Sequence, residues 1–455
     1  MMKKYSNIKF NLLLLLYSCC LILTSNTFAS GSDKYRVVWN QNPESTVTIG
    51  WDQVQGSNPI VYYGEVDFDD EWEKYPFSQK PTRILMNSYA MNTHFVELEN
   101  LTADKAYYFV IKDSKGVGER YWFKTAPDKP QPFTFITGGD TKSYGKSKKA
   151  GQASNRMVAK LRPLFVLFNG DFNSGNGTYF VRWHQWLNDW FNQTTTEDGR
   201  MIPIIPIHGN HEDGDKSVLN KLFNAPFQGT DSTNIYYSLT FGNNFFHIIG
   251  LNTQIDEGAK QQSWLEEDLQ KHKDATFKIA GYHKPFRPHT KKKPENIYQY
   301  EQWTNLFYKY EIDIAVEADA HISKITYPLR PDSSENSSEG FIRDDDNGTM
   351  FIGEGTWGAW PRKNNDSKPW TISNESFNQF KWVHVLPKGL HNPASLEIFT
   401  VKTAEFDKND NQTFYDYNVE NLAEENLFKI PQNITLDTLK EYGVSIKYPF
   451  GLNKK

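Results

Sequence analysis

Between residues 132 and 321 the chain repeats one pattern, a short apolar segment that ends in Asp, Asn or His. These segments have the length and the aromatic and β-branched content of buried strands. Helical stretches lie between them, at 154–161, 179–192 and 260–272. Strands that alternate with helices predict an α/β domain whose helices cover the faces of its sheets. In such domains ligands bind outside the carboxyl ends of the strands, so the polar residues there are expected to share one site.

The chain before this region has a different pattern. Short aromatic and β-branched runs, such as "TVTIGWDQV" and "KAYYFVIKD", are separated by turn residues. About seven strands of this kind predict a β-sandwich. We therefore expect an all-β domain at 33–126, a linker at 127–130 and the α/β domain at 132–404. The polar, Asn-rich segment at 405–455 is predicted to be a C-terminal extension.

Residues 1–29 have the composition of a secretory signal peptide. Lysines precede an apolar run at 12–23, and small residues at cleavage spacing follow it. A transmembrane anchor is the alternative, but the run is too short to span a bilayer comfortably. Both cysteines, Cys19 and Cys20, lie in this segment, so the processed chain would have no thiol for a disulfide or a metal. We expect a secreted or periplasmic protein, with a lipid anchor at Cys19 as a second alternative.

Charge and composition exclude other classes. The formal net charge of −5 offers no basic surface for nucleic acid, and we expect no nucleic-acid partner and no membrane span. The 31 Phe, 24 Tyr and 13 Trp indicate a folded chain and not a disordered one.

Five strand ends supply carboxylates, an amide and imidazoles in chain order. They are Asp140, Asp171, Asn210 with His211, His283, and Asp319 with His321. This mixture suits first-row metals and is rich enough to hold two ions. Two ions about 3.5–4 Å apart can share one carboxylate and one water. The sequence predicts a two-metal centre that takes Fe, Mn, Mg or Zn, with the identity of the metals open.

The order of these motifs, with Gly-Asp twice and then Gly-Asn-His-Glu at 209–212, resembles the calcineurin-like metallophosphoesterase superfamily. The preceding segments "THFVELENLTADKAYYFVIKD" and "YWFKTAP" resemble the fibronectin type III-like N-terminal domain of the purple acid phosphatases. The combined resemblance spans about residues 35 to 400. It implies a four-layer α/β/β/α sandwich after an all-β domain. The implied activity is metal-dependent hydrolysis of small-molecule phosphate mono- or diesters.

The resemblance also implies a role for each residue. The metal ligands would be Asp140 and His321 for the first metal, Asn210 and His283 for the second, and Asp171 as the carboxylate between them. His211 would face the phosphate and stabilise the transition state or protonate the leaving oxygen. A hydroxide that bridges the metals would attack phosphorus.

Two further residues are candidates for substrate binding. Lys142 stands two residues after Asp140, where many members of the superfamily carry a histidine ligand. A protonated ammonium cannot bind a metal, but it can bind a phosphate oxygen. The alternative is a solvated loop lysine, in keeping with the lysines that follow it. His289, six residues after His283, is the second candidate.

Asp319 departs from the family pattern in another way. In the family's Gly-His-x-His turn both histidines are ligands, and Asp319 occupies the place of the first. A carboxylate can still bind metal, and its harder, charged oxygen favours Mg, Mn or Fe over Zn. The alternative is that Asp319 lies beside the metal without binding it. We expect a ligand because Asp319 follows a strand and lies two residues before His321.

These substitutions leave a second function open. A non-catalytic or weakly active extracellular binding protein on a metallophosphatase scaffold would explain the changes at Lys142, Ser174 and Asp319. Buried carboxylates without a metal would be costly, however. Because the other predicted ligands remain, the sequence favours the enzyme.

Ser174 generates a spectroscopic prediction. It stands three residues after Asp171, where the purple acid phosphatases carry the tyrosine whose phenolate binds ferric iron and gives the colour. We expect the purified, metal-loaded protein to lack the purple charge-transfer band. A visible absorption spectrum of the iron-loaded protein checks this, and strong visible absorption would contradict it.

Overall fold

The computed structural model describes residues 30–142, 144–255, 258–407, 409, 411–415 and 450–453. The predicted signal peptide with Cys19 and Cys20, and most of the predicted C-terminal extension, lie outside the described residues. An all-β domain precedes a mixed α/β domain in which sheets dominate, so the predicted fold class is confirmed. Within the described residues there is no helix with the length and hydropathy that crossing a membrane requires.

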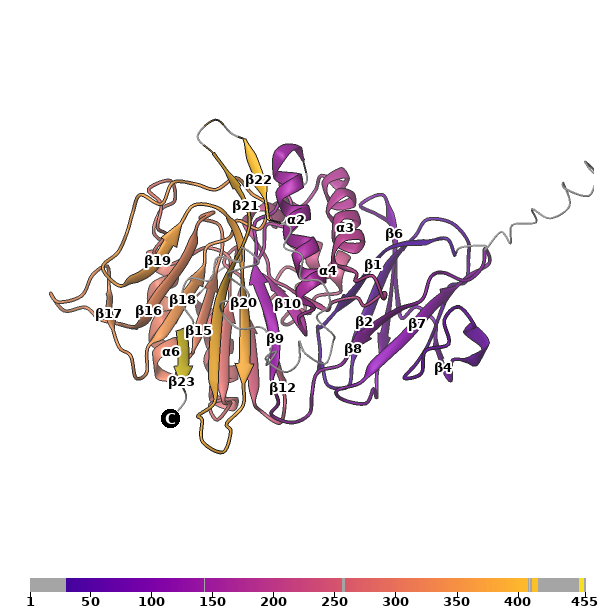
Figure 1. Ribbon diagram of the computed structural model, residues 1–455, viewed down its shortest axis with the longest axis horizontal. Coiled ribbons are helices and arrows are strands. Elements are labelled where there is room, and N and C mark those ends of the chain that lie inside the picture. Colours follow the sequence, from indigo (N-terminus) through magenta and orange to yellow (C-terminus); the bar gives the residue numbers. More distant parts are fainter. Residues whose placement is uncertain are drawn as a thin grey trace, which may run out of the picture.

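The N-terminal domain is a sandwich of two antiparallel layers (Figure 1). One layer has the order β1-β2-β6-β5 and the other β4-β3-β7-β8. Their bounds are β1 (Ser32–Val38), β2 (Val47–Gln53), β3 (Ile60–Gly64), β4 (Phe77–Gln79), β5 (Arg83–Ser88), β6 (Met91–Leu98), β7 (Ala106–Lys112) and β8 (Tyr121–Lys124). The period of two is visible in β7, where Tyr107, Phe109 and Ile111 are buried between the layers.

The α/β domain contains two sheets. The first includes β9 (Phe133–Gly138), β10 (Phe165–Phe168), β11 (Ile204–Pro206), β20 (Asn378–Leu386), β21 (Ser395–Phe406), β22 (Gln412–Phe414) and β23 (Phe450–Asn453). The second includes β12 (Tyr237–Phe241), β13 (Phe246–Gly250), β14 (Phe277–Gly281), β15 (Ile314–Glu317), β16 (Ser323–Pro331), β17 (Phe341–Arg343), β18 (Thr349–Gly353) and β19 (Thr371–Glu375). Apolar side chains join the two sheets, as where Phe246 meets Phe135 with ring centroids 5.5 Å apart. β21 and β22 carry the first sheet past residue 404, where the sequence predicted the domain to end.

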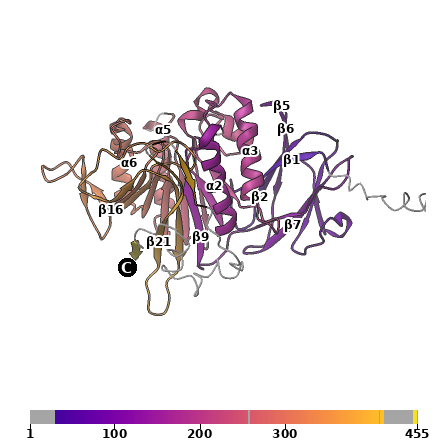
Figure 2. The same ribbon diagram turned by 45° about the horizontal axis from the view of Figure 1, so that its top comes forward.

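Helices form the outer layers (Figures 1 and 2). They are α2 (Gly145–Leu161), α3 (Phe180–Thr194), α4 (Val218–Phe223), α5 (Ala259–Lys271) and α6 (Ile297–Lys309). α2 packs against α3 and against β20 and β21 of the first sheet, whereas α6 packs against β16 of the second sheet. The strands between them are buried on both faces, which explains why they read as continuous apolar runs in the sequence.

The first sheet continues through both domains. β1 pairs in parallel with β11, with Val38 opposite Ile204, and the amide of Trp39 donates to the carbonyl of Ile204 at 3.1 Å. The Trp39 ring is fully buried against Phe165, with centroids 5.3 Å apart. The N-terminal domain is therefore part of the same sheet and core as the α/β domain, and not an appendage on a linker.

A second contact joins the N-terminal domain to the 3-10 helix η2 (Asn210–Asp215), which contains His211. The Tyr89 hydroxyl donates to Asp215 Oδ2 at 2.5 Å, and the Tyr89 carbonyl lies 2.9 Å from His184 Nε2 of α3. The first domain thus helps to fix the turn that carries a predicted catalytic residue.

Lys381 of β20 generates a prediction about stability. Its amine is fully buried, and it donates to Ser323 Oγ of the second sheet at 2.8 Å and to Thr400 Oγ1 at 2.7 Å. Burial lowers the pKa of Lys381 from 10.5 to about 7. Between these two values the unfolded chain binds a proton that the folded chain does not, so stability rises with pH over this interval.

We therefore expect Lys381→Met to raise the free energy of unfolding below pH 7, by on the order of 2 kcal/mol after the two hydroxyl contacts are lost. The gain should shrink as the pH rises from 7 toward 10. Thermal and urea unfolding at pH 6, 7.5 and 9 measure it, with exposed Lys363→Met as the control. A gain that is the same at all three pH values would show that the buried charge is not its cause.

Candidate metal centre

The carboxyl ends of parallel strands from both sheets meet at one edge of the α/β domain. β9, β10 and β11 run parallel in the first sheet, and β14 and β15 run parallel in the second. The predicted site residues follow these strands: Asp140 after β9, Asp171 after β10, Asn210 and His211 after β11, His283 after β14, and Asp319 and His321 after β15. The topology thus brings residues that are far apart in the sequence to one place.

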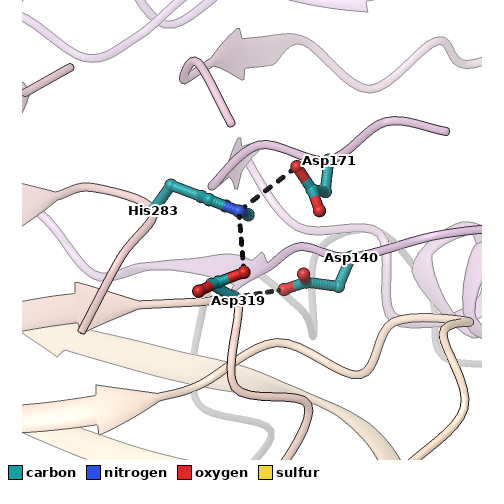
Figure 3. Close-up of side chains that lie close together, drawn as sticks. All are labelled: Asp140, Asp171, His283 and Asp319. Carbon is teal, nitrogen blue, oxygen red and sulfur yellow. Dashed lines mark hydrogen bonds and ion pairs between the residues drawn. The ribbon is translucent and has the colours of Figure 1, made fainter. Parts of the chain in front are cut away.

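Four of these side chains form a compact buried cluster (Figure 3). They are Asp140, Asp171, His283 and Asp319, each of which offers one ligand atom within 4.8 Å of the others. In Figure 3 the three carboxylates lie beyond the nitrogen end of the His283 ring, and dashed lines join this end to Asp171 and Asp319. Such a group of carboxylates and imidazole in a closed space is a donor set for a first-row metal.

His283 shows the arrangement of a metal ligand most clearly. Its Nδ1 lies 2.8 Å from the carbonyl oxygen of Asn169, which can only accept a hydrogen bond, so Nδ1 donates. Its Nε2 faces three oxygens, Asn210 Oδ1 at 3.1 Å, Asp171 Oδ1 at 3.2 Å and Asp319 Oδ1 at 3.7 Å. These groups are the ones predicted for the second metal, together with the substituted Asp319.

The first metal position has fewer donors. His321 Nε2 lies 3.2 Å from Asp140 Oδ1, and His321 Nδ1 lies 3.1 Å from the carbonyl oxygen of Trp360. Asp140 Oδ1 is buried and makes no hydrogen bond to any described residue. A buried carboxylate oxygen that accepts no hydrogen bond can instead bind a cation. Lys142 and Ser174 stand where further ligands were expected, so Asp140, Asp171 and His321 are the candidate donors at this position.

The charge at the centre also requires a cation. Burial alone would lower the pKa of His283, but the carboxylates of Asp171, Asp140 and Asp319 outweigh burial and raise it to about 10. The surrounding carboxylates therefore favour a positive charge at this position. Metal ions replace protons at sites of this kind, so the donor set, the charge and the burial all fit bound metal.

The backbone at the centre is strained. Asp140, Asp171, Asp319 and His321 all have left-handed backbone conformations, with φ between 54° and 66°. Such conformations are uncommon for residues other than glycine and cluster at functional sites. Gly355 after β18 completes the pocket, because a Cβ at this position would lie 2.0 Å from Asp140 Oδ2.

Glu212 is the last residue of the Gly-Asn-His-Glu motif, and only the structure reveals its role at the centre. Its buried carboxylate accepts hydrogen bonds from the amides of Gly209 at 2.9 Å, Asp171 at 2.9 Å and Phe172 at 3.1 Å. Burial and the charge of Asp171 raise the pKa of Glu212 to about 8. Glu212 joins the turn after β10 to the turn after β11, and so holds Asp171 beside His211.

A buried ionic network lies behind the centre. Lys324 Nζ contacts Glu317 Oε2 and lies 2.7 Å from Glu354 Oε1, and all three side chains are almost fully buried. The Tyr282 hydroxyl donates to Glu317 Oε1 at 2.9 Å. These residues flank the turns that carry His283, Asp319 and Gly355. No local sequence pattern identifies this network, because its members come from four different strand ends.

Two further predicted site residues, His211 and His289, differ in where their rings lie. The amide of His211 donates to Asp171 Oδ1 at 2.8 Å, and its half-exposed ring lies on the open side of the centre, with Nε2 3.8 Å from Asp171 Oδ2. Burial lowers the pKa of His211, and the nearby charge of Lys142 lowers it further. His289, in contrast, is fully buried, with Nε2 2.5 Å from Thr371 Oγ1 and Nδ1 3.4 Å from Glu354 Oε1. The structure gives His289 an internal position and not the substrate contact suggested by its spacing.

A cavity of about 590 Å³ opens beside His321 and Lys142. Its wall contains cationic and aromatic side chains and the beginning of α2, namely Lys142, Tyr144, Lys146, His321, Trp360 and Arg362. The cavity adjoins the centre, so it offers room for the part of a ligand that extends away from the metal position.

Comparison with known proteins agrees with this geometry. Residues 32–125 match the family model of the purple acid phosphatase N-terminal domain, and residues 122–323 match that of the calcineurin-like phosphoesterases. Probable purple acid phosphatase 20 of Arabidopsis thaliana is 25% identical over 320 residues, which cover 66% of this chain and 71% of the plant protein. An uncharacterised protein of Mycobacterium tuberculosis is 24% identical over 324 residues, which cover 63% of this chain and 59% of that protein, less than two thirds of its length.

Solved structures show the same fold. The purple acid phosphatase PPD1 from yellow lupin (Lupinus luteus) superposes with a TM-score of 0.66 at 16% identity, over 82% of this chain and 72% of the lupin chain. The structure of PhoD superposes with a TM-score of 0.60 at 12% identity, over 85% of this chain and 90% of that chain. The order of the domains, the strand ends and the buried donor set agree with these matches. Residues 122–323 are thus a calcineurin-like metallophosphoesterase domain, and they follow an N-terminal domain of the purple acid phosphatase type at residues 32–125.

Proposed function

We propose that this chain is a secreted or periplasmic enzyme that hydrolyses small-molecule phosphate monoesters or diesters at a two-metal centre. The observation that carries the proposal is the position of His283 Nε2, which faces oxygens of Asn210, Asp171 and Asp319 while Nδ1 is held by Asn169. A nitrogen held in this way is oriented for a metal. Export rests on the composition of residues 1–29.

The two metal positions differ in their donors. Asp140, Asp171 and His321 would hold the first metal, and Asp171, Asn210, His283 and Asp319 the second. Metal ions bound there would neutralise charge on the phosphoryl oxygens and provide a nucleophile by lowering the pKa of water. Fe, Mn, Mg and Zn are the proposed metals.

The protein residues around the metals then orient the ester and complete the proton transfer. His211 lies on the open side of the centre, where its ring can protonate the leaving oxygen. Lys142 makes no hydrogen bond or ion pair with any described residue and lines the cavity, so its ammonium is available to a phosphoryl oxygen. The cavity would receive the leaving group, and its cationic and aromatic wall accepts groups of varied chemistry. The proposed substrate class is therefore broad.

The first experiment replaces the carboxylate placed between the two metal positions. Asp171→Asn keeps the shape of the side chain but removes its charge, and we expect fewer metals per chain and at least about 100-fold slower hydrolysis. Metal content by mass spectrometry and turnover of p-nitrophenyl phosphate and bis(p-nitrophenyl) phosphate measure both effects. Exposed Asp345→Asn is the matched control. A metal-free, inactive unmodified protein would instead favour the binding protein on a metallophosphatase scaffold.

His211 can be tested separately from metal binding. We expect His211→Asn to retain its metals but to lose about 10²–10⁴-fold in kcat, because proton donation to the leaving oxygen is lost. The loss should be larger for an alkyl phosphate than for p-nitrophenyl phosphate, whose leaving group needs no proton. His391→Asn, at an exposed loop, is the control. An equal loss for both esters would exclude the role of His211 as the acid.

A further inference from the structure

Asp319 does not enter the centre alone. Lys293, in the turn after His289, places its Nζ in contact with Asp319 Oδ1. The same carboxylate oxygen lies 3.7 Å from His283 Nε2. Where the family pattern has a neutral imidazole, this chain therefore has a carboxylate with an ammonium attached to it.

We propose that Lys293 determines the metal affinity of the second position by offsetting the charge that Asp319 adds. The Asp319–Lys293 pair has no net charge, like the neutral histidine that it replaces. Lys293 thus limits how tightly this position holds a divalent cation. The inference rests on the proposed two-metal function and concerns a residue that donates no atom to the metal.

Burial gives the pair its influence. The Asp319 side chain is 6% exposed and that of Lys293 is 22% exposed, so water and salt screen their charges less than those of a surface pair. The neighbouring Lys291 and Lys292 are exposed and make no ion pair with any described residue. Of these three lysines, only Lys293 therefore offsets the charge of a carboxylate at the centre.

The backbone of Asp319 is held without Lys293. Its amide donates to Asp140 Oδ2 at 2.9 Å, and its carbonyl accepts from Arg362 Nη1 at 2.5 Å. Removal of the Lys293 amine should therefore change the charge at the centre while the turn keeps its position. If Lys293 had only a structural role, its loss would instead displace Asp319 and weaken metal binding. The direction of the change in affinity therefore distinguishes the two roles.

The test measures metal affinity directly. We expect Lys293→Met to bind Mn²⁺ and Zn²⁺ at the weaker of the two positions about tenfold more tightly, because a repelling positive charge is removed from beside the ligands. Calorimetric titration of the metal-free full chain and competition with a chelator give the dissociation constants. Lys292→Met is the matched control and should leave the dissociation constants unchanged. Lys293→Arg keeps the charge and should also leave them unchanged.

A reciprocal variant tests the coupling. Asp319→His leaves Lys293 without its carboxylate, so metal affinity should fall at least about tenfold, and Asp319→His with Lys293→Met should recover most of that loss. Weaker or unchanged binding in Lys293→Met, or no recovery in the double variant, would overturn the inference while the two-metal function stands. If the unmodified chain bound no metal under any condition, the proposed function and this inference would both fail.

Discussion

The structure is organised around the repulsion between three buried carboxylates. Asp140, Asp171 and Asp319 meet beside His283, and the side chains of all four residues are buried. Such a cluster is unfavourable unless a cation occupies it, because desolvation of each carboxylate costs several kcal/mol. The strained turns, the amides bound to Glu212 and the network around Lys324 all keep these groups together. These three features belong to one arrangement, which a bound metal would stabilise.

Both sheets of the α/β domain and the N-terminal domain hold the residues of the centre in place. Parallel strands in each sheet end at the same edge, so five turns can contribute side chains to one site. The pairing of β1 with β11 and the contact of Tyr89 with Asp215 connect the first domain to the turn that carries His211. The N-terminal all-β domain is thus a structural support for the centre.

The sequence predicted the parts of this arrangement that are local. A buried strand followed by Asp or His can be recognised within about ten residues, and the order of such ends identified the fold class and the candidate ligands. The pairing of Val38 with Ile204 joins segments 166 positions apart, and nothing in either segment specifies the other. Lys293 lies in a run of three lysines whose composition does not distinguish it. The spacing of His289 suggested a site residue, yet the fold turns its ring inward to Glu354.

The substitutions at the centre are better understood together than one by one. Lys142 replaces a neutral ligand with a cation, Asp319 replaces another with an anion, and Lys293 adds a second cation in contact with Asp319. In a scaffold that had lost its function, the buried carboxylates could be replaced by apolar residues at little cost. Here the departure at Asp319 is in contact with the compensating charge of Lys293, while Asp140, Asp171 and His283 form a buried donor set with Asp319. The retention of this buried donor set favours a modified metal centre over a decayed one, because a scaffold that no longer bound metal would gain nothing from keeping several buried carboxylates together.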